Sequence, residues 1–361
     1  MPYNIAYYVH HHGAGHLMRA IAIAKALIKQ RDCEITFLGT GLSRYRSEIP
    51  SEIGVTELPA DVPAATDVHY RTAEVPNLHY SPFHVQGLLD RNVLILQHFQ
   101  AHPETLCVVD VSSEVTQLAR LSGIPTIVIR QHGDRLDLAH QLAYESADLI
   151  VAPYPESMST PSQEGIYDYK TLFSGGFSRY DDLPTQPDIA HEHDIAVLVG
   201  KGGTNFNSHF VYQLQRQLPE HYRLHIIGDL FRPQTNNNIT MYGQLADPQP
   251  ILARCSVVIC NAGHNTIMEV ASLRKRTVCI PASRPFDEQF AKAAALQRLG
   301  LAIVVAEADM MSVDWLDILR QANELDVSRW SSIIDESALH KIAKKIFQTF
   351  DSHFHTSRNE Q

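Results

Sequence analysis

Short runs of β-branched and other apolar residues alternate with stretches of helical periodicity along this chain, and they do so in two separate series. The first series opens with a strand over 5–9, an amphipathic helix over 17–29 and a second strand over 34–38. Strand and helix in regular alternation are typical of a parallel sheet covered by helices. The pattern therefore predicts an α/β protein.

The two series are separated by a segment over 153–192 that is rich in proline, glycine, serine and tyrosine and lacks apolar periodicity. Further strands are expected over 105–111, 126–130, 148–151, 195–199, 224–227, 239–242, 257–260, 277–280 and 301–305. Helices are expected over 83–99, 313–325 and 337–350, and from residues 113, 134, 207, 248, 264 and 286.

A chain of 361 residues is longer than one hydrophobic core usually organises, so two domains are expected. We predict an N-terminal Rossmann-like domain over 1–170, a linker over 171–192, a C-terminal Rossmann-like domain over 193–335, and a final helix with a polar tail over 336–361. Two doubly wound sheets in tandem would face each other across a central cleft.

Charge and apolar patterning exclude several classes of protein. The formal net charge is −10, so the chain lacks the basic excess of a nucleic-acid binder. No apolar run is long enough to cross a bilayer, and the N-terminus lacks a signal-peptide pattern, so we expect a cytoplasmic protein without stable membrane insertion. The five cysteines are odd in number and lie mostly in apolar runs, which indicates reduced core residues.

Three loops that follow strands carry the residues with chemistry. The first, VHHHGAGHLMRA, contains Gly13 and Gly15 at a helix start, where free backbone N–H groups can face a phosphate. It is not a dinucleotide fingerprint, because Met18 replaces the third glycine. The preceding histidine triplet cannot ligate one ion from an ordinary strand, so no metal site is expected.

His16 and Asp110 are the candidate catalytic residues. A neutral imidazole at a helix start can act as a general base, although His16 could equally cap the helix or bind a ligand oxygen. Asp110 ends a strand and could act as base, orient a histidine, or cap the helix from residue 113.

The second loop, VLVGKGGTNFN, places Gly202, Gly203 and Thr204 between a strand and a helix. Its backbone can form a nest for a pyrophosphate, or it can be a plain tight turn. The P-loop spacing of glycines is absent.

The third segment, NAGHNTIMEVASLRKRTVCIPASRPFDEQ, carries the strongest signal. Glu269 shares a helix face with Asn265 and Thr266, where a carboxylate can accept hydrogen bonds from both vicinal hydroxyls of a ribose. Glu288 and Gln289 lie at the next helix start, where they can bind sugar hydroxyls.

Together these segments resemble the GT-B glycosyltransferases, in particular family 28. The resemblance implies that Glu269 binds the donor ribose and that Glu288 and Gln289 bind the transferred sugar. It implies that His264, Asn265 and Thr266 bind the base and diphosphate and that Gly202 and Gly203 lie beside the diphosphate. The loop residues Gly13, Gly15, Thr204 and Gly263 complete the predicted donor-binding set. The form G-x-G-H-x-x-R, which ends at Arg19, also looks like a related nucleotide-sugar hydrolase.

The function expected from this resemblance is sugar transfer from a nucleoside diphosphate donor, a UDP-sugar, to an acceptor hydroxyl. Transfer would proceed with inversion and without metal or cofactor. A small molecule, a glycoside or a lipid-linked sugar could be the acceptor, and the protein would be a monomer or a homodimer. Two alternatives stay open: a hydrolase that uses water as acceptor, and a non-catalytic sensor of nucleotide-sugars.

Overall fold

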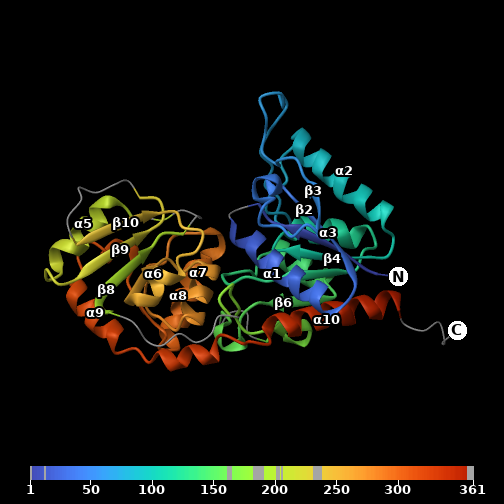
Figure 1. The fold of residues 1–361 in the computed structure, drawn as a ribbon. Helices are drawn as coiled ribbons and strands as arrows, with labels where there is room; N and C mark the ends of the chain where they lie inside the picture. The colour runs from blue at the N-terminus through green and yellow to red at the C-terminus, as the bar shows by residue number, and fades with distance from the viewer. Residues whose placement is uncertain are drawn as a thin grey trace.

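The structure is a computed structural model with two α/β domains side by side (Figure 1). It describes residues 2–11, 14–160, 165–181, 191–200, 204, 206–230 and 238–355. The first domain is built on a seven-stranded sheet and the second on a six-stranded sheet, and every strand pairing in both sheets is parallel. The predicted α/β class is therefore confirmed.

The N-terminal sheet has the strand order β3-β2-β1-β4-β5-β6-β7. Its strands are β1 (Tyr3–Val9), β2 (Cys33–Gly39), β3 (Gly54–Glu57), β4 (Thr105–Asp110), β5 (Thr126–Ile129), β6 (Leu149–Ala152) and β7 (Thr171–Phe173). The direction in which successive strands are added to the sheet reverses between β1 and β4, which are neighbours in the middle of the sheet. Ligands of such sheets bind at this reversal, beyond the carboxyl ends of the strands.

Helices cover both faces of this sheet because successive residues of its strands point to opposite sides. Ile5 and Tyr7 of β1 pack in one core cluster, whereas Ala6 and Tyr8 pack in another on the other face. The first face is covered by α1 (Ala14–Gln30) and α10 (Ala338–Phe354). The second face is covered by α2 (Gln86–Ala101), α3 (Ser113–Leu121) and α4 (Leu138–Ser146).

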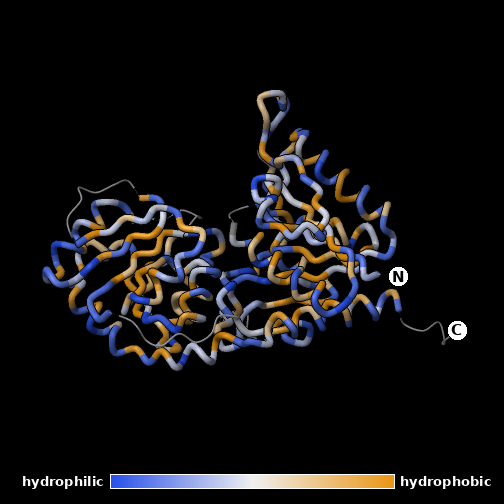
Figure 2. The backbone as a smooth tube through the Cα atoms, viewed as in Figure 1, coloured by the Kyte–Doolittle hydropathy of each residue, from blue (hydrophilic) through white to orange (hydrophobic). Residues whose placement is uncertain are grey.

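The C-terminal sheet repeats this plan with the order β10-β9-β8-β11-β12-β13. Its strands are β8 (His191–Leu198), β9 (Arg223–Ile227), β10 (Ile239–Gly243), β11 (Cys255–Cys260), β12 (Arg276–Cys279) and β13 (Ala302–Val304). One face carries α5 (Ser208–Gln217) and α9 (Trp315–Asn323), and the other carries α6 (Gln249–Arg254), α7 (His264–Ser272) and α8 (Glu288–Arg298). Apolar residues concentrate in the strands of both domains (Figure 2).

Several local expectations needed correction. The edge strands β3 and β7 were not predicted, because each is short and only partly buried. Helix α4 begins at Leu138, not near 134, since Asp137 is its N-cap and accepts a hydrogen bond from the His140 backbone. Helix α8 begins at Glu288, because the two residues before it adopt left-handed backbone conformations. All five cysteines are free thiols, as expected.

The chain crosses between the domains twice. Residues 174–181 lead from the first sheet toward the second, and after α9 the chain returns so that α10 packs against α1 of the first domain (Figure 1). Gly176 lies where the two crossings touch, and its backbone bonds Ile333 and Asp335. A side chain at Gly176 would collide with the Met268 sulfur, because an added Cβ would lie 2.3 Å from it.

Candidate active site between the two domains

His16 and Asp110 meet at the reversal of the N-terminal sheet. His16 lies in the first turn of α1, directly after β1, and Asp110 is the last residue of β4. The His16 Nδ1 atom is 3.1 Å from the Asp110 Oδ1 atom. The structure therefore brings the two predicted catalytic residues together, with the Asp110 carboxylate within hydrogen-bond distance of the imidazole.

Arg19 completes this group, although its place in the site was not predicted from the sequence. It follows His16 by one turn of α1, and its guanidinium bonds the same Asp110 oxygen. Both side chains of this ion pair are buried. Burial by itself would raise the pKa of Asp110, but Arg19 and then His16 lower it to about 2, so the carboxylate is charged at neutral pH.

The charged carboxylate decides which nitrogen of His16 is protonated. The Arg19 Nη2 atom is also 3.1 Å from His16 Nδ1, and a guanidinium can only donate. Arg19 already donates to Asp110, however, and a bond to an ionised acceptor is about twice as strong as one to a neutral acceptor. We therefore assign the His16 proton to Nδ1, which donates to Asp110 and leaves Nε2 able to accept a proton.

Helix α7 of the second domain faces this group. It begins at His264 with Gly263 as its N-cap, directly after β11 at the reversal of the second sheet. The Asn265 Nδ2 atom donates to the Gly15 carbonyl oxygen at 3.1 Å, so the first turn of α7 contacts the first turn of α1. The points at which the strand order reverses in the two sheets thus lie close to each other.

His264 is neutral at this interface. Burial lowers its pKa well below the usual value, and the cations Lys292 and Arg19 lower it further. Thr266 lies two residues on, and its hydroxyl is 3.8 Å from the position of a Cβ added to Gly263. The predicted residues of the α7 start therefore include an uncharged imidazole, beside the N–H groups of the first helical turn.

Glu269 lies one turn further into α7, and it has a partner that the sequence did not reveal. The Arg179 Nε atom is 2.9 Å from the Glu269 Oε1 atom. Burial raises the pKa of Glu269, and the Arg179 charge opposes that increase. The Glu269 side chain is 17% exposed and the Arg179 side chain 46% exposed, so the pair lies at the edge of solvent.

The first turn of α8 contributes Glu288 and Gln289. The Gln289 amide oxygen accepts a hydrogen bond from the Ala282 backbone at 2.9 Å, so this side chain also fixes the loop after β12. Glu288 is 3.4 Å from the ammonium of Lys292, which is fully buried. Burial would raise the pKa of Glu288, but Lys292 and Arg135 lower it, so Glu288 is ionised.

The same loop touches the first domain through its backbone. The Asp134 N–H donates to the Phe286 carbonyl oxygen at 2.7 Å. Gly133 allows this approach, because a Cβ at Gly133 would lie 2.3 Å from that oxygen and the residue has a φ of +108°. The loop before Glu288 is therefore held between the two domains.

Three of the predicted donor-binding residues, Gly13, Gly202 and Gly203, lie outside the described residues. Thr204 is described, and its hydroxyl accepts a hydrogen bond from the Phe206 backbone at 3.0 Å. A Cβ at Gly15 would lie 3.4 Å from the Asn265 side chain, so the Gly15 backbone packs directly against that side chain.

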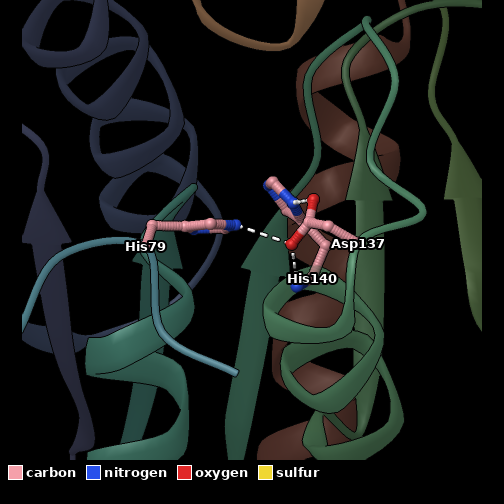
Figure 3. A group of neighbouring side chains, drawn as sticks. All are labelled: His79, Asp137 and His140. Carbon is pink, nitrogen blue, oxygen red and sulfur yellow. Dashed lines mark hydrogen bonds and ion pairs between the residues drawn. The ribbon is translucent and has the colours of Figure 1, made fainter. Parts of the chain in front are cut away.

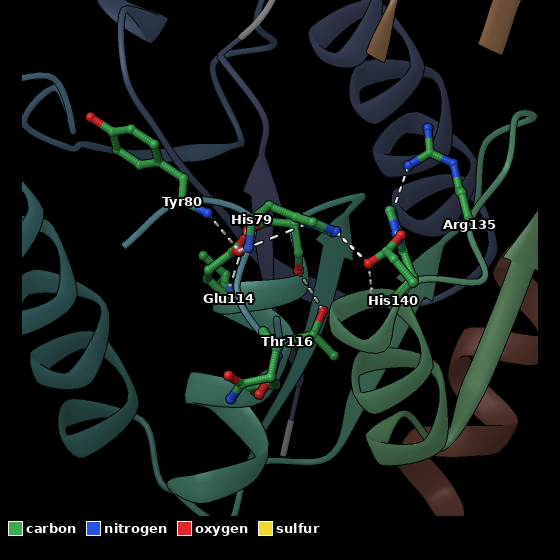
Figure 4. Close-up of polar contacts among 11 residues, drawn as sticks. His79, Tyr80, Glu114, Thr116, Arg135 and His140 are labelled. Carbon is green, nitrogen blue, oxygen red and sulfur yellow. Dashed lines mark hydrogen bonds and ion pairs between the residues drawn. The ribbon is translucent and has the colours of Figure 1, made fainter. Parts of the chain in front are cut away.

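A second polar cluster, which was not predicted, consists of His79, Asp137 and His140 (Figure 3). It lies near the loop that precedes Glu288. The Asp137 carboxylate bonds His79 Nε2 at 2.7 Å and His140 Nδ1 at 2.5 Å. Arg135 donates to His140 Nε2 at 2.8 Å, and Glu114 accepts from the His79 backbone (Figure 4).

Although two histidines and a carboxylate can hold a metal ion, the surrounding bonds favour a hydrogen-bonded network. Arg135 can only donate, so His140 Nε2 carries no proton and Nδ1 carries the proton that Asp137 accepts. If a metal ion bound His140 Nδ1, the imidazole proton would have to lie on Nε2. There it would face the N–H groups of the Arg135 guanidinium. The rings of His79 and His140 instead pack on Phe286 with centroids 4.9 and 4.7 Å away, so the cluster supports the loop before Glu288.

Comparison with known proteins bears on the second domain most directly. Residues 194–321 match the family model described as "Glycosyltransferase family 28 C-terminal domain". The second domain is therefore similar to the C-terminal domain of that family, and the matched region is here named the family 28 domain. This match begins in β8 and ends in α9, so β8, β11, α7 and α8 of the candidate site lie within the family 28 domain.

Curated relatives extend the similarity at low identity. A UDP-N-acetylglucosamine--N-acetylmuramyl-(pentapeptide) pyrophosphoryl-undecaprenol N-acetylglucosamine transferase of Streptococcus pneumoniae strain JJA is 24% identical over 198 residues, which is 53% of this chain and 56% of that protein. The transferase of the same description from Clostridium kluyveri is 24% identical over 264 residues, 67% of this chain and 71% of that protein. The chain thus matches little more than half the length of the pneumococcal relatives.

Solved structures establish the fold of the whole chain. The glycotransferase of kitacinnamycin superposes with a TM-score of 0.70 at 16% identity, over 97% of this chain and all of the other. MurG of Acinetobacter baumannii superposes with a TM-score of 0.64 at 16% identity, over 96% of this chain and all of the other. The fold is GT-B, as the resemblance implied, with the family 28 domain as its second half. Among the described residues, no helix has the length and apolarity needed to span a membrane.

Proposed function

We propose that this protein transfers a sugar from a nucleoside diphosphate donor to an acceptor hydroxyl in the space between the two domains. One observation carries the proposal: the His16–Asp110 pair of the first domain faces the start of α7 in the family 28 domain, with Asn265 bonded to Gly15. This contact supports the proposal that a general base and a phosphate-binding helix start act at one site.

The donor is held by the family 28 domain in this proposal. Glu269 accepts hydrogen bonds from the ribose hydroxyls, and the N–H groups at the start of α7, with Gly202, Gly203 and Thr204, bind the diphosphate. Glu288 and Gln289 bind hydroxyls of the transferred sugar. We propose UDP as the nucleotide because the curated relatives are named as transferases that use UDP-N-acetylglucosamine.

The chemical step is a single displacement at the anomeric carbon. His16 Nε2 takes the proton of the acceptor hydroxyl as its oxygen attacks, and the bond from the anomeric carbon to the diphosphate oxygen breaks with its electron pair on the diphosphate. Attack from the opposite side inverts the configuration. Asp110 stabilises the imidazolium that forms, and the α7 start stabilises the departing charge without a metal ion.

The proposal is tested by incubating the protein with UDP-N-acetylglucosamine, first alone and then with acceptors that are phenolic, glycosidic or lipid-linked. UDP release that depends on an acceptor, with one new glycoside formed per UDP, supports transfer. Rapid release of free sugar in water alone supports the hydrolase, and binding without turnover supports the sensor. If neither UDP nor its sugar derivatives bind, the proposed donor site is wrong.

A further inference from the structure

In the free protein, the carboxylate proposed to bind the donor ribose is already occupied by a side chain from the segment that joins the domains. Arg179 contacts Glu269 through its Nε atom at 2.9 Å, and its Nη1 atom donates to the Ala246 carbonyl oxygen at 2.8 Å. The guanidinium also lies over the Tyr180 ring, 4.9 Å from the ring centroid. Arg179 is thus held on the surface around Glu269.

The neighbours of Arg179 fix this segment to the family 28 domain. Ser178 bonds the Ser272 hydroxyl at 2.9 Å, and Ser272 in turn donates to Asp181 at 2.6 Å. The Tyr180 hydroxyl donates to Asp247 at 3.0 Å. The backbone on both sides of Arg179 therefore stays in place if the guanidinium alone moves.

The Arg179–Glu269 pair is suited to reversible opening. Almost half of the Arg179 side chain is exposed, so water can solvate the guanidinium as soon as it leaves the carboxylate. Glu269 is largely shielded from solvent, so its carboxylate needs replacement donors when Arg179 departs. Two vicinal hydroxyls are such donors, because each can donate one hydrogen bond to the carboxylate.

We infer that Arg179 gates the proposed donor site: it occupies Glu269 in the free protein and is displaced from the carboxylate by the two hydroxyls of a ribonucleoside diphosphate. The inference rests on the proposed role of Glu269. A gate of this kind makes Arg179 a specificity residue for the sugar of the nucleotide. A ligand must donate hydrogen bonds to Glu269 in place of the Arg179 ion pair.

The gate predicts a specific effect on deoxyribonucleotides. A 2′-deoxy ligand supplies one hydroxyl fewer, and in the wild-type protein Arg179 can return to the carboxylate oxygen that is left without a donor. In Arg179→Ala that oxygen has no replacement. The ratio of the dissociation constants of 2′-deoxy-UDP and UDP is therefore larger in the variant than in the wild type.

The experiment measures UDP and 2′-deoxy-UDP binding by calorimetry to the full chain and to three variants, Arg179→Ala, Glu269→Ala and Arg320→Ala. Arg320 is the matched control, because it forms an exposed ion pair within α9, with Asp317 at 3.5 Å. We expect Arg179→Ala to bind UDP about two- to fivefold more tightly than wild type, the range for an exposed ion pair. Arg320→Ala should match wild type for both ligands.

The variants separate the gate from the proposed function. Weaker UDP binding in Glu269→Ala supports the ribose role, and unchanged binding in that variant contradicts the proposed function and the gate with it. If Glu269→Ala weakens binding while Arg179→Ala binds UDP no more tightly than wild type, the gate alone is wrong. An unchanged or smaller deoxy-to-ribo ratio in Arg179→Ala also overturns the gate, since a purely structural role for Arg179 would leave that ratio unaltered.

Discussion

Asn265 and Gly15 join the two halves of the molecule through one hydrogen bond, from the Asn265 side-chain amide to the Gly15 carbonyl oxygen at 3.1 Å. Asn265 lies in the first turn of the helix proposed to bind phosphate, and Gly15 directly precedes the proposed base. The bond therefore links the two sides of the proposed site directly.

Replacing Asn265 by aspartate keeps the side-chain shape, removes the donor and places a carboxylate against a carbonyl oxygen. We expect kcat/KM for the donor to fall by about two- to tenfold, which corresponds to the net value of one hydrogen bond. Initial rates at varied donor concentration measure the change. Asn238→Asp is a matched control, because Asn238 makes the same kind of bond to the Glu220 carbonyl within one domain.

His16→Ala removes the proposed base. General-base catalysis contributes roughly 100- to 10,000-fold, so turnover should fall by that amount while UDP affinity changes little. Single-turnover rates and calorimetric titration measure the two quantities separately. His353→Ala serves as control, since His353 also pairs with an aspartate, Asp148 at 3.3 Å, on the surface. Wild-type turnover in His16→Ala would remove this histidine from the mechanism.

Asp110→Asn leaves Arg19 buried without a charged partner. Breaking a buried ion pair costs about 3–5 kcal/mol, so the free energy of unfolding should fall by about that amount in urea titrations. The double variant Arg19→Met with Asp110→Asn should recover part of the loss, because no unpaired charge is then buried. Equal or greater destabilisation in the double variant would show that the charge pair is not the cause.

His140 should make the stability of the protein depend on pH. Burial, and then the Arg135 charge, lower the pKa of His140 to about 4 from 6.5. Below pH 6.5 the unfolded chain therefore binds more protons at this site than the folded chain, and stability is lost as pH falls toward 4. Between pH 7 and pH 5.5 this group alone should remove about 1 kcal/mol from the free energy of unfolding.

Urea unfolding of wild type and His140→Gln at both pH values checks this expectation. The variant should lose about 1 kcal/mol less than wild type on acidification, whatever its own stability at neutral pH. Parallel pH profiles for the two proteins would show that His140 is not the titrating group.

Local sequence patterns predicted most of the strands and helices and the two-domain plan. Strands such as β4 and β11 are buried on both faces, so they appear as continuous apolar runs that the chain itself reveals. The glycine-containing turns that follow them are also local features, and parallel topology brings the carboxyl ends of such strands to one edge. The two-domain α/β plan follows from these patterns alone, and the resemblance to GT-B proteins rests on the motifs in these loops.

Only the tertiary structure decided which side chains are partners. Arg19 and Asp110 are separated by 91 positions, Asn265 and Gly15 by 250, and Glu269 pairs with an arginine from the segment between the domains. No periodicity links such residues, because their proximity results from strand order and from the packing of one domain on the other. The sequence by itself therefore determined the sheets and the loops that carry the chemistry, while the fold determined the charge, protonation and occupancy of each group in them.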